Sequence, residues 1–279
     1  DLERIFDEDL AQATPAEAVD LAPDDPALIV FTSGTTAKPK GVLHSQSYLF
    51  GQATQAQHWF GAEPGELCWC TAAPGWSKSS RNSFIAPWLR GARSLLVEGR
   101  FDPDTRLDIV RQQQVNLLCQ APTEYRVLAR RTELAPTPSL RRMVSAGEAL
   151  NPEVIGAFRE ATGLEIADGY GQTETGAITG MRPGESVAGR EGSMGRPLPG
   201  VETRIVEGEL QVRAATCPTF FHSYIDGTRF EGEWWATGDL VTEDDEGYLF
   251  HEGRNDDLIS SSGYRIGPVE VESALLSHP

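Results

Sequence analysis

The stretch FTSGTTAKPKG, residues 31–41, gathers side chains that can bind an anion. Its hydroxyl groups belong to Thr32, Ser33, Thr35 and Thr36. Gly34 lets backbone N–H groups approach a ligand closely, and Lys38 and Lys40 add positive charge. It is not a Walker A loop, because Pro39 stands where that motif has its second glycine. From composition alone the stretch is either a phosphate-binding loop or a hydroxyl-rich turn with two solvated lysines.

A second glycine-rich stretch, DGYGQTETG, occupies residues 168–176. It fails the dinucleotide-binding fingerprint, because Glu174 stands where GxGxxG, counted from Gly169, has its last glycine. A carboxylate at that position suits Mg²⁺ that is bound mainly through phosphate oxygens. Taken alone, the stretch is better explained as a turn with a solvated glutamate.

Two later stretches carry further charged residues. EWWATGDL places Asp239 after a Thr-Gly turn, where its carboxylate can accept hydrogen bonds from two ribose hydroxyls or only cap the turn. GRNDDLISSSGYRIGPVEVE carries Arg254, Asp256 and Arg265. This last segment is either a joint between two parts of the protein or a charged linker.

Short β-prone runs alternate with amphipathic segments between residues 27 and 170. Asp102-Pro103 and Asn151-Pro152 each predict a helix start, because an N-cap residue precedes a proline whose missing N–H costs nothing there. This alternation is typical of a mostly parallel sheet covered by helices. We expect strands at residues 27–31, 66–72, 92–99, 115–121, 140–147 and 164–170.

The pattern of the sequence changes near Arg190, where shorter runs separated by turn residues begin. These runs predict antiparallel strands. We therefore expect an α/β fold with layered, mostly parallel sheets and helices, plus a small β-barrel-like subdomain. The expected parts are an α/β part at residues 1–190, a β-rich part at 191–255, and a hinge with the start of a further domain at 256–279.

The chain has 24 Lys and Arg residues against 41 Asp and Glu residues, which gives a net charge of −17. Such an acidic surface repels nucleic acid and anionic membranes, so local positive charge must bind any anionic ligand. No apolar run approaches the roughly 20 residues that a membrane helix needs. The four cysteines form no CxxC pair and suit reduced thiols, so we expect a cytoplasmic protein. Because the chain opens on Asp1 instead of Met, we also expect a fragment of a longer protein.

Five motifs follow one another along the chain: FTSGTTAKPKG, SAGEALNPEV, DGYGQTETG, WWATGDL and GRNDDLISSSGYRIGP. Their order and spacing resemble the adenylate-forming superfamily, which includes acyl- and aryl-CoA synthetases, adenylation domains of peptide synthetases and luciferases. The resemblance runs from about Asp24 to the end of the chain. The runs SSGYRIGPVEVESALLSHP and APTEYRVL look closest to the medium-chain acyl-CoA synthetases.

The resemblance implies an ATP-dependent acid:CoA ligase for a medium-chain or aromatic acid. In this family the carboxylate of the acid attacks the α-phosphate of ATP, which gives acyl-AMP and pyrophosphate, and the thiol of coenzyme A then displaces AMP. The implied substrates are a small carboxylic acid, ATP and coenzyme A, with Mg²⁺ as the metal. Such an enzyme has to spread the negative charge of the triphosphate and keep water from the activated acyl group.

The same resemblance implies roles for individual residues. Thr173 would contact the α-phosphate, Glu174 would bind Mg²⁺ and Lys40 would hold the β- and γ-phosphates, which makes these three the expected catalytic residues. Asp239 and Arg254 would bind the ribose, while Gly147 to Ala149, Asp168 and Tyr170 would surround the adenine. The expected nucleotide-binding residues are Thr32, Ser33, Gly34, Thr35, Thr36, Gly147, Glu148, Ala149, Asp168, Gly169, Tyr170, Gly171, Gln172, Asp239 and Arg254.

Two further groups follow from the resemblance. Asp256 matches the hinge about which a small C-terminal domain rotates, and Ser262, Gly263 and Arg265 would face the active site on the coenzyme A and phosphate side. For the acyl pocket, acetyl-CoA synthetases carry a Trp-Trp pair before Gln-Thr-Glu, but Tyr170-Gly171 stands there in this chain. A glycine leaves the pocket open, so we expect an acid larger than acetate. Trp76 is expected at the wall of this pocket, with a core aromatic as the alternative.

The chain also departs from the family pattern. Ala37 stands where many relatives have glycine, and the adenylation lysine of the family lies beyond Pro279. Two other functions therefore stay open: an adenylation domain that loads a carrier protein, and a nucleotide-binding fragment without catalysis.

Overall fold

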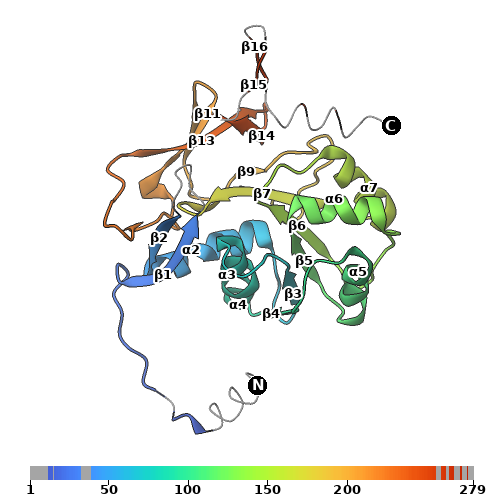
Figure 1. Ribbon diagram of the computed structural model, residues 1–279, viewed down its shortest axis with the longest axis horizontal. Helices are drawn as coiled ribbons and strands as arrows, with labels where there is room; N and C mark the ends of the chain where they lie inside the picture. The colour runs from blue at the N-terminus through green and yellow to red at the C-terminus, as the bar shows by residue number, and fades with distance from the viewer. Residues whose placement is uncertain are drawn as a thin grey trace.

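A seven-stranded mixed sheet, with strands in the order β4-β3-β5-β6-β7-β8-β9, lies at the centre of the computed structural model (Figure 1). The structure describes residues 12–14, 16–32, 39–255, 259–261 and 264–266, and positions 271 and 275. Neighbouring strands from β4 to β7 are parallel, whereas β8 and β9 continue the sheet antiparallel. The strands are β3 Leu67–Cys70, β4 Arg93–Ser94, β5 Leu117–Gln120, β6 Arg142–Ala146, β7 Ile166–Gln172, β8 Gly176–Gly180 and β9 Arg196–Pro197.

Helices cover both faces of this sheet. The chain first moves outward from β3 to β4 and then returns across the sheet to β5, β6 and β7. Right-handed crossovers in opposite directions place their helices on opposite faces. One face carries α3 Ser77–Ser80, η2 Arg81–Ile85 and α4 Ala86–Leu89, beside α2 Gln46–Gln55 and η1 Ala56–Phe60, and the other carries α5 Pro103–Gln112, α6 Pro122–Arg131 and α7 Pro152–Thr162.

Both predicted helix starts are confirmed. Asp102 precedes α5 and its side chain accepts a hydrogen bond from the backbone N–H of Asp104. Asn151 precedes α7 in an extended conformation, but its side chain makes no cap hydrogen bond, so proline at the first helical position fixes the start of that helix. In α7 the residues that face the sheet are buried: Val154, Ile155 and Phe158.

The run at residues 27–31 is a strand, but the prediction that it belongs to the parallel sheet is wrong. It forms part of β1 Pro26–Thr32, which pairs antiparallel with β2 Lys40–Ser45, while β2 also pairs with β12 Ser223–Tyr224. A parallel neighbour requires a crossover of a dozen or more residues, and the connection between β1 and β2 is too short for one. The predicted strand at 92–99 is also shorter than expected, since only Arg93–Ser94 pairs with β3.

The β-rich region forms an antiparallel sheet with the order β10-β11-β13-β14, followed by a separate strand pair (Figure 1). The predicted boundaries between parts of the chain stay a prediction. Among the described residues, no helix is long and apolar enough to cross a membrane. The elements are β10 Thr203–Val206, β11 Glu209–Arg213, η3 Ala214–Thr216, β13 Trp234–Glu243, β14 Leu249–Arg254, β15 Ile259–Ser261 and β16 Tyr264–Ile266.

Trp59 of η1 fixes how α2 and η1 pack on β7 and β8. It is 2% exposed and lies so close to two glycines that a Cβ on Gly169 or Gly180 would come within 2.5 or 2.6 Å of its ring. The absence of a side chain at both positions is therefore what lets the indole reach the sheet. This contact supports the strand whose far end carries the candidate site.

We expect Gly180→Ala to destabilise the protein by about 1–3 kcal/mol, because the new methyl group collides with the Trp59 ring in a close-packed core. Gly156→Ala is the matched control. A Cβ at Gly156, within α7, meets nothing within 4 Å, so this change should stabilise the helix by roughly 0.5–1 kcal/mol. Urea unfolding of both variants measures the effect, and a Gly180→Ala variant as stable as the parent would contradict the role of Trp59.

Candidate active site

The candidate site lies at the carboxyl ends of the parallel strands, where the loops after β3, β6 and β7 border a cleft of about 1630 Å³. Carboxyl ends of parallel strands meet at one edge of a sheet, so loops that are far apart in sequence come together there. From the loop after β3 comes Trp76, from the loop after β6 come Gly147 and Glu148, and from β7 come Tyr170 and Gly171. The structure therefore gathers the motifs SAGEALNPEV and DGYGQTETG around one cleft.

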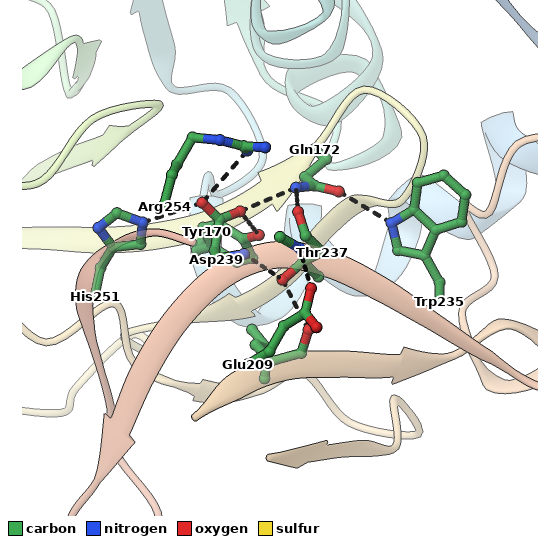
Figure 2. Close-up of polar contacts among 10 residues, drawn as sticks. Tyr170, Gln172, Glu209, Trp235, Thr237, Asp239, His251 and Arg254 are labelled. Atoms are coloured by element: carbon green, nitrogen blue, oxygen red, sulfur yellow. Dashed lines mark hydrogen bonds and ion pairs between the residues drawn. The ribbon is translucent and has the colours of Figure 1, made fainter. Parts of the chain in front are cut away.

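The carboxylate of Asp239 is the centre of a hydrogen-bond network, drawn in Figure 2. Its Oδ2 atom accepts hydrogen bonds from the Tyr170 hydroxyl and, at 2.9 Å, from Gln172 Nε2. Its Oδ1 atom lies 3.2 Å from His251 Nε2 and 3.6 Å from Arg254 Nη1. The expected nucleotide residues of β7, β13 and β14 thus contact one another, although nearly seventy positions separate Tyr170 from Asp239 in the sequence.

This network keeps Asp239 ionised. Burial alone raises the pKa of its carboxyl, but hydrogen bonds from His251 and Tyr170 and the charges of His251 and Arg254 outweigh burial and hold the pKa below its ordinary value. Asp239 is 5% exposed, so its charge is carried at a buried position where these donors matter. The result is a fixed anionic acceptor between the two sheets.

Gln172 joins Asp239 to the rest of β13. Its Nε2 atom also donates to the Thr237 carbonyl at 2.6 Å, and its Oε1 atom accepts from Trp235 Nε1 at 3.0 Å (Figure 2). The sequence prediction included Gln172 and Asp239 but missed Trp235, which contacts Gln172, and His251, which contacts Asp239. Trp235 stands inside the WWATGDL motif and could have been considered, whereas His251 has no local signal and is brought to Asp239 only by the pairing of β13 with β14.

The three expected catalytic residues lie around the same region. Thr173 Oγ1 lies 3.5 Å from Ser77 Oγ, and Glu174 Oε1 accepts a hydrogen bond from the Tyr224 hydroxyl at 3.1 Å. The Lys40 ammonium lies 5.5 Å from the centre of the same Tyr224 ring. Tyr224 of β12 therefore contacts both Lys40, the last lysine of FTSGTTAKPKG, and Glu174 of DGYGQTETG, which no sequence pattern indicates.

The adenine residues that the sequence predicted come from two neighbouring strand ends. Gly147 follows β6 with a φ of +105°, a backbone conformation that favours glycine, and leads into Glu148 and Ala149. The Glu148 carboxylate accepts a hydrogen bond from the Thr123 hydroxyl at 2.5 Å. Asp168 on β7 is buried, and burial raises the pKa of its carboxyl well above the ordinary value.

The interpretation of Gly171 needs correction. A Cβ built on Gly171 would lie 1.8 Å from the Gly176 carbonyl oxygen on the neighbouring strand β8. The glycine is required by the close approach of two backbones at an irregular point in their pairing, so its presence is no evidence by itself for a deeper acyl pocket. Trp76, by contrast, lines the cleft and is 69% exposed. The described residues therefore do not bury it, and the alternative of a core aromatic is wrong.

Several predicted positions lie outside the described residues. Thr32 ends β1 and Arg265 lies in β16. The remaining members of the phosphate stretch and of the hinge group, Ser33, Gly34, Thr35, Thr36, Asp256, Ser262 and Gly263, are not described.

The sequence prediction missed the segment that follows Trp76. This segment, α3 and η2, brings Ser77, Lys78 and Arg81 to the cleft. Lys78 Nζ donates a hydrogen bond to the Ala146 carbonyl at 2.8 Å. Nothing in the short polar run SKSSR distinguishes it from a solvated turn. Only the fold, including the hydrogen bond from Lys78 of α3 to Ala146 at the end of β6, indicates its place in the site.

The comparison with known families decides the identity of this arrangement. The sequence profile of the family described as AMP-binding enzyme matches residues 2–242. The chain belongs to this family. Two relatives of the chain are the uncharacterised acyl-CoA ligase YtcI of Bacillus subtilis, 38% identical over 288 residues, and the mitochondrial acyl-coenzyme A synthetase ACSM4 of Rattus norvegicus, 38% identical over 295 residues. The chain spans about half the length of both, since the matches cover 96% and 98% of it but 54% and 50% of them.

A solved structure shares the fold of this chain. The crystal structure of the anthranilate CoA ligase AuaEII in complex with anthranoyl-AMP superposes with a TM-score of 0.84 at 30% sequence identity. It covers 95% of this chain, and the chain covers 54% of it. The resemblance to adenylate-forming enzymes and the α/β fold that it implied are therefore confirmed.

His44 of β2 gives the stability of the protein a measurable pH dependence. Burial, and after it the positive charge of Arg81, lower the pKa of this histidine from 6.5 to about 4. Between these values the unfolded chain binds a proton that the folded protein does not hold, so proton uptake favours unfolding. We expect the free energy of unfolding to fall as pH drops through this range, with a slope approaching ~1.4 kcal/mol per pH unit from this group.

Urea unfolding between pH 4 and 8 measures this slope, and His44→Gln should flatten it over the same range. A variant that keeps the full slope of the parent would show that another group carries the pH dependence.

Proposed function

We propose that the protein to which this chain belongs is an ATP-dependent acid:CoA ligase that activates a medium-chain or aromatic carboxylate as acyl-AMP. The observation that carries the proposal is the ionised carboxylate of Asp239, which contacts Tyr170 and Arg254, two residues that line the cleft. The names of its relatives support the same chemistry, because they are acyl-CoA ligases and synthetases, and a solved neighbour is an anthranilate CoA ligase with bound anthranoyl-AMP.

Asp239 supplies what a ribose requires. An ionised carboxylate offers about four acceptor positions, and a pair of neighbouring hydroxyls can donate to both of its oxygens. Tyr170 lines the cleft beside it and presents a ring on which adenine can stack. Gly147, Glu148 and Thr173 border the same cleft, so the residues expected at the base and at the α-phosphate share it.

The phosphate end is the most demanding part of the reaction, because negative charge must be spread while the acid attacks the α-phosphate. Lys40 supplies a cation, Thr173 and Ser77 supply hydroxyl donors, and Glu174 supplies one carboxylate. One carboxylate together with phosphate oxygens is the donor set that Mg²⁺ commonly takes, so these residues fit the ion. When bound, Mg²⁺ neutralises part of the triphosphate charge, and Glu174 would hold it there.

The acyl group would lie beside Trp76, whose exposed ring faces the cleft. An acid larger than acetate stays part of the proposal, but it now depends on the size of the cleft and not on Gly171. We further propose that residues 1–190, 191–255 and 256–279 are the α/β part, the β-rich part and the hinge of the larger enzyme. A cytoplasmic location is proposed from the cysteines, which are all free and buried.

The test is acid-dependent exchange of pyrophosphate with ATP by the full-length protein, followed by thioester formation with coenzyme A. The acids run from acetate to decanoate and include benzoate. Exchange without thioester formation would favour the adenylation domain that loads a carrier protein. ATP binding without exchange for any acid would favour the non-catalytic nucleotide-binding fragment and refute the ligase.

We expect Glu174→Gln to lower the Mg²⁺-dependent exchange rate by roughly 100-fold, because even indirect supports of a metal ligand are worth 10–100-fold. Nucleotide affinity, measured by calorimetry with ATP, should fall much less, since Asp239 and Tyr170 stay intact. Glu160→Gln on the exposed side of α7 is the matched control and should change neither quantity. Equal losses of rate and affinity in Glu174→Gln would count against the assigned role.

A further inference from the structure

Arg81, the first residue of η2, is a buried cation that forms no ion pair with the residues that the structure describes. It is 8% exposed and lines the cleft. Its Nε atom donates to the Ser77 carbonyl at 3.2 Å and its Nη2 atom to Ser77 Oγ at 3.3 Å. Its Nη1 atom has no hydrogen-bond partner among the described residues, and no carboxylate in that part of the chain lies within ion-pair distance of the guanidinium.

Such a position is costly unless a ligand completes it. A buried charge is normally paired, because the loss of hydration is not otherwise compensated. The protein has 41 acidic residues, so an acidic partner would be easy to supply, yet the described residues place none here. The charge acts on its surroundings, since it helps to lower the pKa of the buried His44.

A second cation lies on the same segment. Lys78 lines the cleft, and its ammonium has one hydrogen bond, to the Ala146 carbonyl at 2.8 Å. Within the described part of the chain no carboxylate lies within ion-pair distance of it either. Two cations of this short segment therefore line the same cleft as Trp76 of the expected acyl wall.

Ser77 relates this region to the reaction. Its hydroxyl contacts Arg81 on one side and lies 3.5 Å from Thr173 Oγ1 on the other. Under the proposed function Thr173 touches the α-phosphate, where the reacting carboxylate must be. Arg81 is thus connected to the expected reacting centre through one residue, Ser77.

We propose that Arg81, assisted by Lys78, binds a second anionic group on the substrate, so that the preferred acid is a dicarboxylic acid. This inference rests on the proposed function and defines its substrate class. A guanidinium presents two parallel N–H donors that match a carboxylate. In Arg81 the edge that includes the unpartnered Nη1 atom offers these donors. A simple fatty acid would place apolar carbons against this charge and leave it unpaired, so the site should discriminate against it.

The experiment compares acids of equal chain length that differ only in the distal carboxylate: adipate with hexanoate, suberate with octanoate, and terephthalate with benzoate. The readout is the ratio of kcat/KM in pyrophosphate exchange within each pair, measured with the full-length protein. In at least one pair we expect the dicarboxylate to be preferred by roughly tenfold or more. Arg81→Met should reduce that ratio by at least tenfold, and Arg81→Lys should keep an intermediate ratio, because lysine retains the charge but loses the fork.

Arg204→Met is the matched control, because Arg204 is an exposed arginine on β10 whose guanidinium contacts Gln211 and Trp234 outside the cleft. It should leave every ratio unchanged. A parent protein that prefers the monocarboxylate in every pair would overturn the proposal. So would an Arg81→Met variant that loses the same factor for both acids of a pair, since that result assigns Arg81 to the reacting carboxylate or to the fold.

Calorimetric titration of suberate and octanoate in the absence of ATP separates this proposal from the proposed function. If no acid supports exchange but suberate binds and Arg81→Met weakens that binding, the ligase assignment fails and the anion site stands. If suberate binds no better than octanoate to the parent protein, the anion site fails even where exchange is observed.

Discussion

The hydrogen bonds on Asp239 are the contact on which the rest of the site depends. They connect β7 of the mixed sheet, through Tyr170 and Gln172, to β13 and β14 of the antiparallel sheet, through Asp239 itself and Arg254. A buried ionised carboxylate must keep all of its donors, because losing one leaves a charge uncompensated in a region of low polarity. The network therefore holds the end of β7 at a fixed separation from β13 and β14.

The distribution of charge follows the same logic on a larger scale. The protein is strongly acidic, with a net charge of −17, yet Lys40, Lys78, Arg81 and Arg254 gather in or beside the cleft. A local cluster of cations attracts small anions to one place, while the acidic surface around it repels extended polyanions. Nucleoside triphosphates and carboxylates are small anions of this kind, whereas nucleic acids are not.

Local signals made parts of this structure predictable from the sequence. Asp102 and the proline after Asn151 mark helix starts, and the β-prone run at residues 164–170 predicts the strand that carries Tyr170, because these signals depend on neighbouring residues. The sheet partner of β1, the contact between His251 and Asp239 and the true constraint on Gly171 all depend on residues that are distant in sequence. No periodicity or motif carries that information, so these features had to come from the packing.

A helical irregularity explains why Arg81 escaped the sequence prediction. In η2 the Ala86 N–H bonds to the Arg81 carbonyl, five residues back, and in η1 the Gly61 N–H does the same with Ala56. Such π turns hold more residues per turn than an α-helix, so the apolar spacing of 3.6 residues no longer tells which side chains face inward. The consecutive residues Arg81, Asn82 and Ser83 are all buried as a result. The same widening in η1 turns Trp59 toward β7. A regular helix would distribute these side chains differently, so the two π turns decide which of them face the sheet and the cleft.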